Sequence, residues 1–467
     1  MIANLKPYQE YKDSGLSWLG KIPAHWDPMR LKRVLRPIDR RSATGEETLL
    51  SLRRDHGVVI FADHFSRPSQ GATNVGFKLV RRGQLVVNRM QANNGLIFHS
   101  RLAGLVSPDY SVFEGRVAVS MDYLSALLRT PAYRSHFRAE STGLGTGSAG
   151  FLRLYDDKLL QTAISAPPLP EQEGIVRFLE WANRRLEAAI RTKRKVIALL
   201  NEQRQAIVHR VVTRGLDPSV PLKPSGIPWL GDIPEHWEVR RLRHLIEGRL
   251  TYGANEAAEF TNPDWPRYIR ITDFSLDGTL KFHTFRSLPP SIASDYLVSP
   301  GDILFARSGA TVGKAFLVVT LTGAACHAGY LIRARPARDL VQPEYLFAFT
   351  QSRAFSAWRD STFNTATIQN IGADKYANLP IPLPPLQEQQ TILESLTTHQ
   401  QPILAATSRL DREIELLKEY RTRLVADVVT GKLDVREAAA RLLKEPLAPV
   451  EEVEPADDLD AEEEDAE

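Results

Sequence analysis

SGLSWLGKIPAHWDPMRLKRVL, at residues 14–35, returns as SGIPWLGDIPEHWEVRRLRHLI at residues 225–246. The two stretches share 11 of 22 residues without a gap, at a constant shift of 211. Self-similarity over such an interval indicates an internal duplication, and it sets the organisation of the chain before any single element is assigned. We therefore expect two copies of one structural unit in the 467 residues, rather than one large domain.

Two further pairs of similar segments extend the duplication. PPLPEQ at 167–172 corresponds to PPLQEQ at 384–389, and VVTRGLD at 211–217 corresponds to VVTGKLD at 428–434, both at a shift of 217. Each repeat thus begins with W-L-G-x-I-P-x-H-W, continues for about 130 residues to P-P-L-x-E-Q, and ends in a long run with periodic apolar residues.

The runs that follow each P-P-L-x-E-Q segment have the spacing of helices. Their apolar residues recur mostly at steps of three or four. We predict a central long helix at 171–215, and a distal long helix with a C-terminal helix at 387–444, with a kink or a new start at Pro402. A helix of about 43 residues is roughly 65 Å long, too long to bury its apolar stripe alone. The two helices should therefore pack on each other, antiparallel, as a coiled coil.

The stretches between these segments mix strand and helix signals. We expect an α+β fold, with globular domains at 1–170 and 216–386 related as a pseudo-twofold tandem repeat. A weak similarity pairs GQLVVNRM at 83–90 with GDILFARS at 301–308, after which the two sequences differ. The predicted strands lie at 84–87, 116–119, 303–305, 316–319 and 330–333, and the predicted short helices at 121–128 and 343–353.

The composition limits the class of protein. Cys326 is the single cysteine, which excludes a disulfide scaffold and favours an ordinary buried thiol. No run approaches the roughly 18 to 20 apolar residues of a membrane helix, and MIANLKPYQE has no apolar signal-peptide core. We therefore expect a cytoplasmic protein without membrane contact.

The formal net charge of +3 conceals two oppositely charged parts. Residues 445–467 hold 12 acidic and no basic residues, and this composition predicts a disordered tail. Residues 1–444 carry 59 Lys and Arg against 44 Asp and Glu, a charge of +15. A body this basic favours a polyanionic partner such as nucleic acid.

Motifs for catalysis or cofactor binding are incomplete. SGATVGKA at 308–315 lacks the first glycine and the magnesium-binding hydroxyl of a phosphate loop. GLGTGSAG at 143–150 follows no apolar strand, and Asp264 replaces the second proline of the N-P-P-aromatic motif of amino-methyltransferases. The 11 histidines show no metal-ligand spacing. We predict no catalytic residue, no metal and no cofactor.

Two W-L-G-x-I-P-x-H-W motifs, two P-P-L-x-E-Q segments leading into long helices, and dissimilar centres together resemble the specificity subunit of type I restriction-modification systems. The resemblance covers residues 5–440, and VNRMQANNG at 87–95 and YIRITDF at 268–274 resemble recognition segments of that family. It implies that each globule is a target recognition domain for double-stranded DNA and that the long helices form an antiparallel coiled coil. It further implies a non-catalytic chain that assembles with methyltransferase and restriction subunits. The acidic tail has no counterpart in this pattern.

Duplicated frames with different centres suit a chain that reads two different half-sites, with the helix pair fixing the spacer between them. Base-edge readout uses Arg or Lys on guanine, Asn or Gln on adenine, and small hydroxyls for adaptable contacts. For each candidate, base contact, phosphate contact and a plain loop role remain open. The predicted DNA-binding residues are Arg89, Gln91, Asn93, Asn94, Arg307, Ser308, Thr311, Lys314, Asn364, Thr365, Gln369 and Asn370. The predicted phosphate contacts are Arg53, Arg54, Lys78, Arg81, Arg82 and Arg267.

Trp18, Trp26, Trp229 and Trp237 occupy the same places in the two repeated motifs, which favours packing between globule and helix over stacking on bases. Two other classes of function remain open from the sequence. An autonomous DNA-binding repressor would bind its operator tightly alone, and an enzyme with an unrecognised methyl-transfer or nuclease site would act without partners. A specificity subunit should instead bind its target much more strongly once methyltransferase subunits are added.

Overall fold

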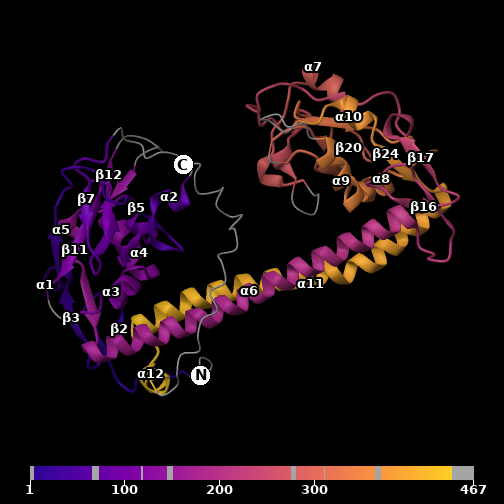
Figure 1. Cartoon of the computed structure of the whole chain (residues 1–467). Helices are drawn as coiled ribbons and strands as arrows, with labels where there is room; N and C mark the ends of the chain where they lie inside the picture. Colours follow the sequence, from indigo (N-terminus) through magenta and orange to yellow (C-terminus); the bar gives the residue numbers. More distant parts are fainter. Residues whose placement is uncertain are drawn as a thin grey trace. The chain divides into compact units, whose positions relative to one another are not determined.

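The computed structural model describes residues 5–65, 73–116, 119–144, 151–274, 280–309, 311–362 and 370–443 (Figure 1). It is an α+β chain that forms two compact units: unit 1 comprises Met1–Arg191 and Glu413–Glu467, and unit 2 comprises Thr192–Arg412. The chain passes between the units within its two long helices, α6 (Leu169–Arg214) and α11 (Leu386–Val429). Each unit therefore contains one globular stretch and a part of both helices. The predicted acidic tail at 445–467 lies outside the described residues.

The central sheet has the same strand order in the two units. In unit 1 the antiparallel order is β4 (Leu35–Ile38), β11 (Tyr110–Gly115), β8 (Leu85–Asn88) and β9 (Ile97–His99). In unit 2 it is β18 (Thr251–Tyr252), β23 (Leu331–Ala334), β20 (Ile303–Ala306) and β21 (Ala315–Leu317). The weakly similar segments GQLVVNRM and GDILFARS thus contain strands at the same place in the two sheets.

Leu85–Val87 of β8 and the whole of β20 are apolar because each is covered on both faces. Leu85 packs into the larger cluster of unit 1, whereas Val86 packs into a second cluster on the opposite face. Phe305 and Leu304 divide in the same way in unit 2. A strand buried on both faces reads as a continuous apolar run rather than an alternating one.

Short strand pairs surround each central sheet. In unit 1 they are β1 (Tyr11–Asp13) with β2 (Lys21–Pro23), β3 (Asp27–Arg30) with β14 (Ala163–Ala166), β5 (Leu50–Arg53) with β6 (Gly57–Ile60), β7 (Lys78–Val80) with β10 (Gly104–Val106), and β12 (Thr142–Leu144) with β13 (Phe151–Arg153). In unit 2 they are β15 (Leu222–Pro224) with β16 (Asp232–Pro234), β17 (Glu238–Arg241) with β24 (Pro380–Leu383), and the parallel pair β19 (Arg267–Ile269) with β22 (Ala325–His327).

The predicted short helices and strands agree with the structure except at two places. The helix predicted at 121–128 is confirmed as α3, but the one predicted at 343–353 is two helices, because Ser352 caps the second by accepting a hydrogen bond from Phe355 N at 3.2 Å. The strand predicted at 116–119 is not confirmed, because β11 ends at Gly115 and residues 117 and 118 lie outside the described residues. The short helices are α1 (Leu31–Val34), α2 (Phe61–His64), α3 (Met121–Leu128), α4 (Pro131–Glu140), α5 (Asp156–Gln161), α7 (Pro290–Ala293), α8 (Pro343–Thr350), α9 (Arg353–Thr362), α10 (Ala373–Ala377) and α12 (Arg436–Leu442).

In unit 1 the two repeated motifs meet at the first turn of α6. Glu171 accepts a hydrogen bond from Trp26 Nε1 at 3.1 Å, and its other oxygen lies 2.8 Å from His25 Nε2. The next residue, Gln172, accepts a hydrogen bond from Ser120 N at 3.0 Å. The Glu-Gln pair of P-P-L-x-E-Q therefore holds both the H-W dipeptide and the start of α3.

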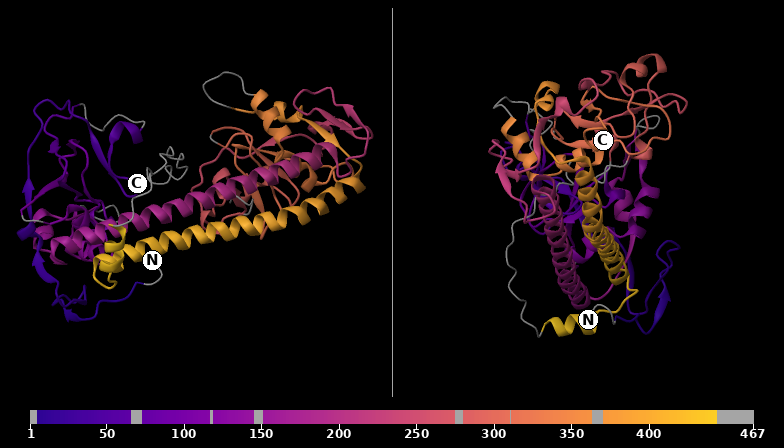
Figure 2. Two further views of the ribbon diagram at one scale, coloured as in Figure 1. Left: turned by 60° about the horizontal axis from the view of Figure 1, so that its bottom comes forward. Right: turned by 90° about the vertical axis from the view of Figure 1, so that its right-hand side faces the viewer.

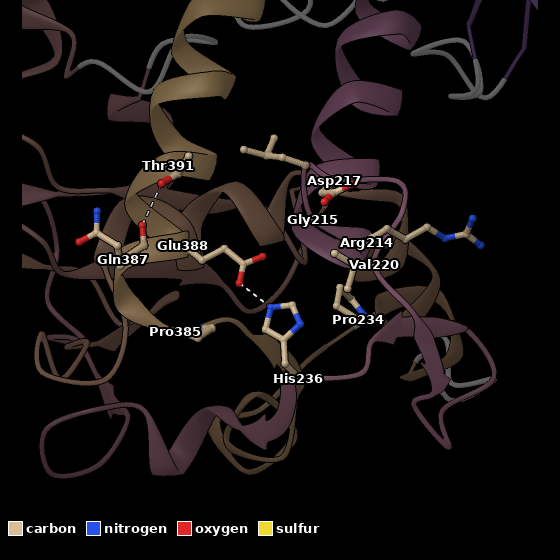
Figure 3. Close-up of a pocket in the computed structure, with 11 residues that line it drawn as sticks. Arg214, Gly215, Asp217, Val220, Pro234, His236, Pro385, Gln387, Glu388 and Thr391 are labelled. Atoms are coloured by element: carbon tan, nitrogen blue, oxygen red, sulfur yellow. Dashed lines mark hydrogen bonds and ion pairs between the residues drawn. The ribbon is translucent and has the colours of Figure 1, made fainter.

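Unit 2 repeats this arrangement at the first turn of α11. Glu388 accepts from Trp237 Nε1 at 3.0 Å. Its other oxygen lies 2.7 Å from His236 Nε2 (Figure 3). Gln389 accepts from Gln342 N at 2.8 Å, at the start of α8. Trp237, like its counterpart in unit 1, is completely buried, so the predicted packing role of this tryptophan pair is confirmed.

The long helices are antiparallel, as predicted. In the core of unit 1, Ile175 near the start of α6 packs in the same cluster as Leu424 and Val428 near the end of α11. In the core of unit 2, Val211 near the end of α6 packs with Ile392 near the start of α11. Figures 1 and 2 show the two helices side by side along these parts.

Each globule is closed by the helix of the other repeat. Tyr123 Oη in unit 1 donates to Val429 O, at the end of α11, at 2.9 Å. Tyr345 Oη in unit 2 donates to Val212 O, at the end of α6, at 3.2 Å. The VVT segments quoted above therefore recur because both helix ends perform the same packing task.

Pro402 does not restart the distal helix, so that part of the prediction is wrong. Helix α11 runs through Pro402 without a break. Proline removes one N–H donor, but Pro402 is exposed, and water can satisfy the carbonyl that loses its partner. Among the described helices, none combines the length and apolar character needed to span a bilayer.

Candidate nucleic-acid interface

In unit 2, the eight-residue connection after β20 brings several predicted DNA-contact residues together. The Arg307 guanidinium lies over the Tyr252 ring, 4.9 Å from its centroid, and Arg307 Nε is buried without a hydrogen-bond partner among the described residues. Ser308 forms a β-bridge with Asn370, and Ile371 N donates to Arg307 O at 2.8 Å. Arg307, Ser308 and Asn370 thus form one polar cluster.

The second half of this connection is a tight turn. Lys314 is exposed, and its N–H donates to Thr311 O at 3.0 Å. Gly313 has a φ of +81°, and a Cβ at this position would lie 2.2 Å from Cδ of Arg359 on α9. Glycine is required here because the backbone is left-handed and an arginine packs directly behind it.

In unit 1 the corresponding connection follows β8, and its first arginine is bound to the fold. Arg89 Nε donates to Asp109 O at 2.6 Å, and Arg89 Nη2 donates to Pro108 O at 3.2 Å. Asp109 also accepts from Arg153 Nη2 at 2.8 Å. The Arg89 side chain is 17% exposed, and its donors hold the turn at 107–109.

The rest of the unit 1 connection forms a short 3₁₀ turn, Ala92–Asn94. Asn94 Nδ2 donates to Gln91 Oε1, and Arg134 Nε on α4 donates to Asn93 O at 3.1 Å. All three of these predicted contact residues remain half-buried. Gly95 ends the turn with a φ of +86°, and its missing side chain faces Arg134, which parallels the glycine and arginine of unit 2.

Three of the predicted phosphate contacts, Arg54, Arg81 and Arg82, are exposed in unit 1. Arg53 is half-buried, since its guanidinium lies 5.1 Å from the centroid of Phe65 and donates to His64 O at 3.4 Å. These side chains come from β5, the turn after it, and the turn before β8. Of these, Arg54 lines a cavity together with Asn94 of the loop after β8.

Lys78 and Arg267 are less accessible than the sequence suggested. Lys78 is 7% exposed, its nearest carboxylate oxygen is Asp39 Oδ1 at 3.8 Å, and burial lowers its pKa. Arg267 Nη2 donates to Lys281 O at 2.7 Å, and burial lowers the pKa of its guanidinium. Asn364, Thr365 and Gln369 lie outside the described residues.

Sequence reasoning missed three residues at these loops: Tyr252, Arg134 and Arg359. None has a local signal, because each is brought to its loop by the fold from a distant strand or helix. The one usable signal was the match of Gly95 with Gly313 after the weakly similar strands, which marks equivalent turns.

Two further features of the described residues bear on chemistry: metal ligation and the single thiol. No three of their His, Cys, Asp and Glu side chains group as metal ligands. Cys326 is completely buried, and burial raises the pKa of its thiol to about 12. The thiol therefore stays protonated and packs in the core, as predicted.

Comparisons with known proteins agree with this architecture. Residues 234–416 match the family model described as Type I restriction modification DNA specificity domain. The chain is 27% identical over 210 residues to the type I restriction enzyme StySPI specificity subunit of Salmonella potsdam, a match that covers only 44% of each chain. It is 23% identical over 355 residues to the MjaVIII specificity subunit of Methanocaldococcus jannaschii, which covers 74% of this chain and 78% of the relative.

A solved structure supports the same fold. A chain from work on the structural basis of complex assembly and conformational transition of the type I R-M system has a TM-score of 0.61 at 19% identity, and the match covers 88% of this chain and 99% of that one. Within the second repeat, residues 234–416 are thus similar to the DNA specificity domain of type I restriction-modification systems. The predicted resemblance of the chain to specificity subunits of these systems is confirmed.

Proposed function

We propose that this chain is the non-catalytic DNA-recognition subunit of a cytoplasmic type I restriction-modification complex. Each unit would read one half of a bipartite double-stranded target. The chain would also hold the methyltransferase and restriction subunits that act on the DNA. The relatives that support this proposal are themselves named specificity subunits.

The observation that carries the proposal is that the two units share one sheet architecture but differ in the loops after β8 and β20. The sheets have one strand order, and the connections after β8 and β20 begin at the same place and have the same length. Yet their side chains differ, with Gln91, Asn93 and Asn94 in one and Ser308, Thr311 and Lys314 in the other. Equal frames with unequal polar loops suit two half-sites of different sequence.

The helix pair would set the spacer between the half-sites. Helices α6 and α11 have 46 and 44 residues, and each contributes core residues to both units. Two helices packed on each other would hold the distance between the units, and the B-DNA turn of about 34 Å would fix which groove each unit meets.

We assign the contacts as follows. In unit 2, Arg307 and its polar cluster would meet base edges, because the buried Nε and the stacked guanidinium leave its outer nitrogens to recognise guanine. In unit 1 the amide side chains would read adenine, and Arg89 would position them. Base contacts are assigned to Gln91, Asn93, Asn94, Arg307, Ser308, Thr311, Lys314, Asn364, Thr365, Gln369 and Asn370, and phosphate contacts to Arg53, Arg54, Arg81, Arg82 and Arg267, with Lys78 supporting the sheet beneath them.

Sequence selection tests the proposal against its alternatives. Random duplexes are selected by the full chain alone and by the chain with its methyltransferase subunits. We expect weak selection alone, and a sharp bipartite sequence with a fixed gap in the complex. Tight operator selection by the chain alone would support a repressor. Transfer of labelled methyl groups to DNA by the chain alone would support an unrecognised enzyme.

A further inference from the structure

A second polar site in unit 1 lies between the globule and the long helices, in a cavity of about 520 Å³. Its walls come from the turn after β5, the end of the loop after β8, helices α3 and α4, and both long helices. It collects five arginines and four carboxylates: Arg54, Arg101, Arg129, Arg134, Arg421, Asp55, Asp122, Glu180 and Glu187.

The charges are unevenly distributed around this cavity. Arg101 lies 3.6 Å from Asp122 and 3.2 Å from Glu180, and Arg421 lies 3.6 Å from Glu187. These groups neutralise one another along the long helices and α3. Two further lining arginines, Arg129 and Arg134, donate to backbone carbonyls and form no ion pair with a carboxylate among the described residues.

Arg129 is held in the cavity wall without a contacting carboxylate among the described residues. Its guanidinium lies 4.1 Å from the Phe98 ring centroid, and Nη2 donates to Arg54 O at 2.9 Å. Burial lowers the pKa of Arg129 to about 10, with Arg421 and Arg134 adding repulsion against the attraction of Asp55. A desolvated arginine with like charges beside it is favoured only when an anion offsets the cost.

The remaining polar groups are compatible with such an anion. Arg134 donates one nitrogen to Asn93 O, and burial followed by repulsion from Arg54 lowers its pKa. Asn94 lines the same cavity, so the cavity adjoins the loop after β8, to which base contacts were assigned above. On α6, Asn183 has a buried side-chain oxygen without a partner among the described residues. An amide that turns its nitrogen inward would donate to an anion there.

We propose that this arginine cavity binds a backbone phosphate of the DNA strand that lies against the loop after β8. The inference rests on the proposed DNA-recognition function and names a contact that this function did not include. Guanidinium groups form paired hydrogen bonds to phosphate, and the adjoining Asn94 places DNA rather than a free anion beside them. The phosphate offsets the repulsion between Arg129 and Arg134, so base reading by the loop is coupled to a fixed backbone position.

The test measures binding of a fluorescein-labelled duplex of about 30 base pairs to the full chain by anisotropy over a salt series. The cavity variants are Arg134→Gln and the double variant with Arg129→Gln. Arg138→Gln is the matched control, because it removes the same charge from an exposed position of α4 outside the cavity. Arg129→Lys keeps the charge and tests the need for the planar group. Thermal unfolding identifies any variant that is not folded, and Arg134→Gln remains informative if the double variant is not.

We expect the slope of log affinity against log salt to fall by roughly 0.9 in the cavity variants, as for one lost phosphate contact, with Arg138→Gln unchanged. Arg129→Lys should keep the slope and bind more weakly. An unchanged slope in folded cavity variants, or an equal loss in Arg138→Gln, would overturn the proposal. So would binding of a labelled 445–467 peptide that the cavity variants lose while DNA binding stays intact. If the complex selects a bipartite target but the slopes do not change, only the cavity assignment fails, whereas absence of any bipartite target defeats the proposed function itself.

Discussion

The two units share the Glu, His and Trp contacts but differ in the residues that surround the glutamate and in its exposure. In unit 1, Glu171 also accepts a hydrogen bond from Tyr8 Oη at 2.8 Å, and its side chain is 9% exposed. In unit 2, Ser219 stands at the place of Tyr8 and donates to Asp217 instead, at 2.6 Å. Glu388 is 28% exposed, beside an open cavity of about 410 Å³ (Figure 3).

The difference follows from the segments that cover each site. In unit 1 the segment after α11 covers it, since Asp434 N donates to Lys6 O at 2.8 Å, and Arg436 of α12 lies over Tyr8. In unit 2 the corresponding junction is continuous chain, from the end of α6 into β15. Both repeats therefore share the Glu, His and Trp contacts, but different segments pack over these contacts in the two units.

The largest expected effect is a loss of unfolding free energy that is greater when Glu171 is replaced than when Glu388 is replaced. Glu171→Ala leaves the Trp26 N–H and the Tyr8 hydroxyl without their acceptor in a buried site, and should cost about 2–4 kcal/mol of unfolding free energy. Glu388→Ala should cost about 1–3 kcal/mol, because water reaches this site. Urea unfolding with hydrogen exchange, which assigns the loss to a unit, provides the measurement. Glu235→Ala, an exposed residue of the repeated motif, is the control, and an equal or larger cost for Glu388→Ala would refute the comparison.

A second contrast concerns the arginines that open the two loops. Arg89→Ala should lower the unfolding free energy by about 1.5–3 kcal/mol, because a charged donor to two carbonyls is lost, and should alter only the half-site of unit 1. Arg307→Ala should leave stability nearly unchanged and reduce discrimination in the other half-site by about 1–3 kcal/mol. Denaturation and sequence selection on both variants check this. Equal weakening of both half-sites by either change would contradict independent reading units.

The smallest expected effect is a pH dependence in unit 2. His327 is completely buried between Tyr296 O and Thr251 O, and burial lowers its pKa. The unfolded histidine takes up a proton near its ordinary pKa of about 6.5, whereas the folded one resists it. The contribution to stability is therefore present above about pH 6.5 and lost as the pH falls below it.

Urea unfolding of the chain and of His327→Asn at pH 5 and pH 7.5 measures this loss. The variant should show a smaller decrease, although His136 and His209, whose pKa values burial also lowers, keep part of it. Identical decreases in the two proteins would show that His327 does not contribute.

Much of the repeated architecture could be predicted because the duplication places the same motifs at fixed shifts in the sequence. Trp26 and Trp237 recur at a fixed shift, so their packing role follows from the sequence, whereas their hydrogen bonds to Glu171 and Glu388 are evident only from the structure. Pro402 misled the prediction because its exposure, which lets water replace a lost donor, is not evident from spacing. The loops could be predicted only as segments. Arg89 and Arg307 occupy equivalent positions, yet one is bound by the turn at 107–109 and the other stacks on Tyr252, and both partners are distant in sequence.

The most direct test of the account changes the helix pair and nothing else. Matched four-residue insertions after Arg204 in α6 and after His399 in α11 preserve the antiparallel packing and lengthen both helices by about 6 Å. Sequence selection by the complex should then return the same two half-sites with a gap about two base pairs longer. The original gap, or an altered sequence in either half-site, would contradict the claim that two independent reading units are spaced by the paired helices.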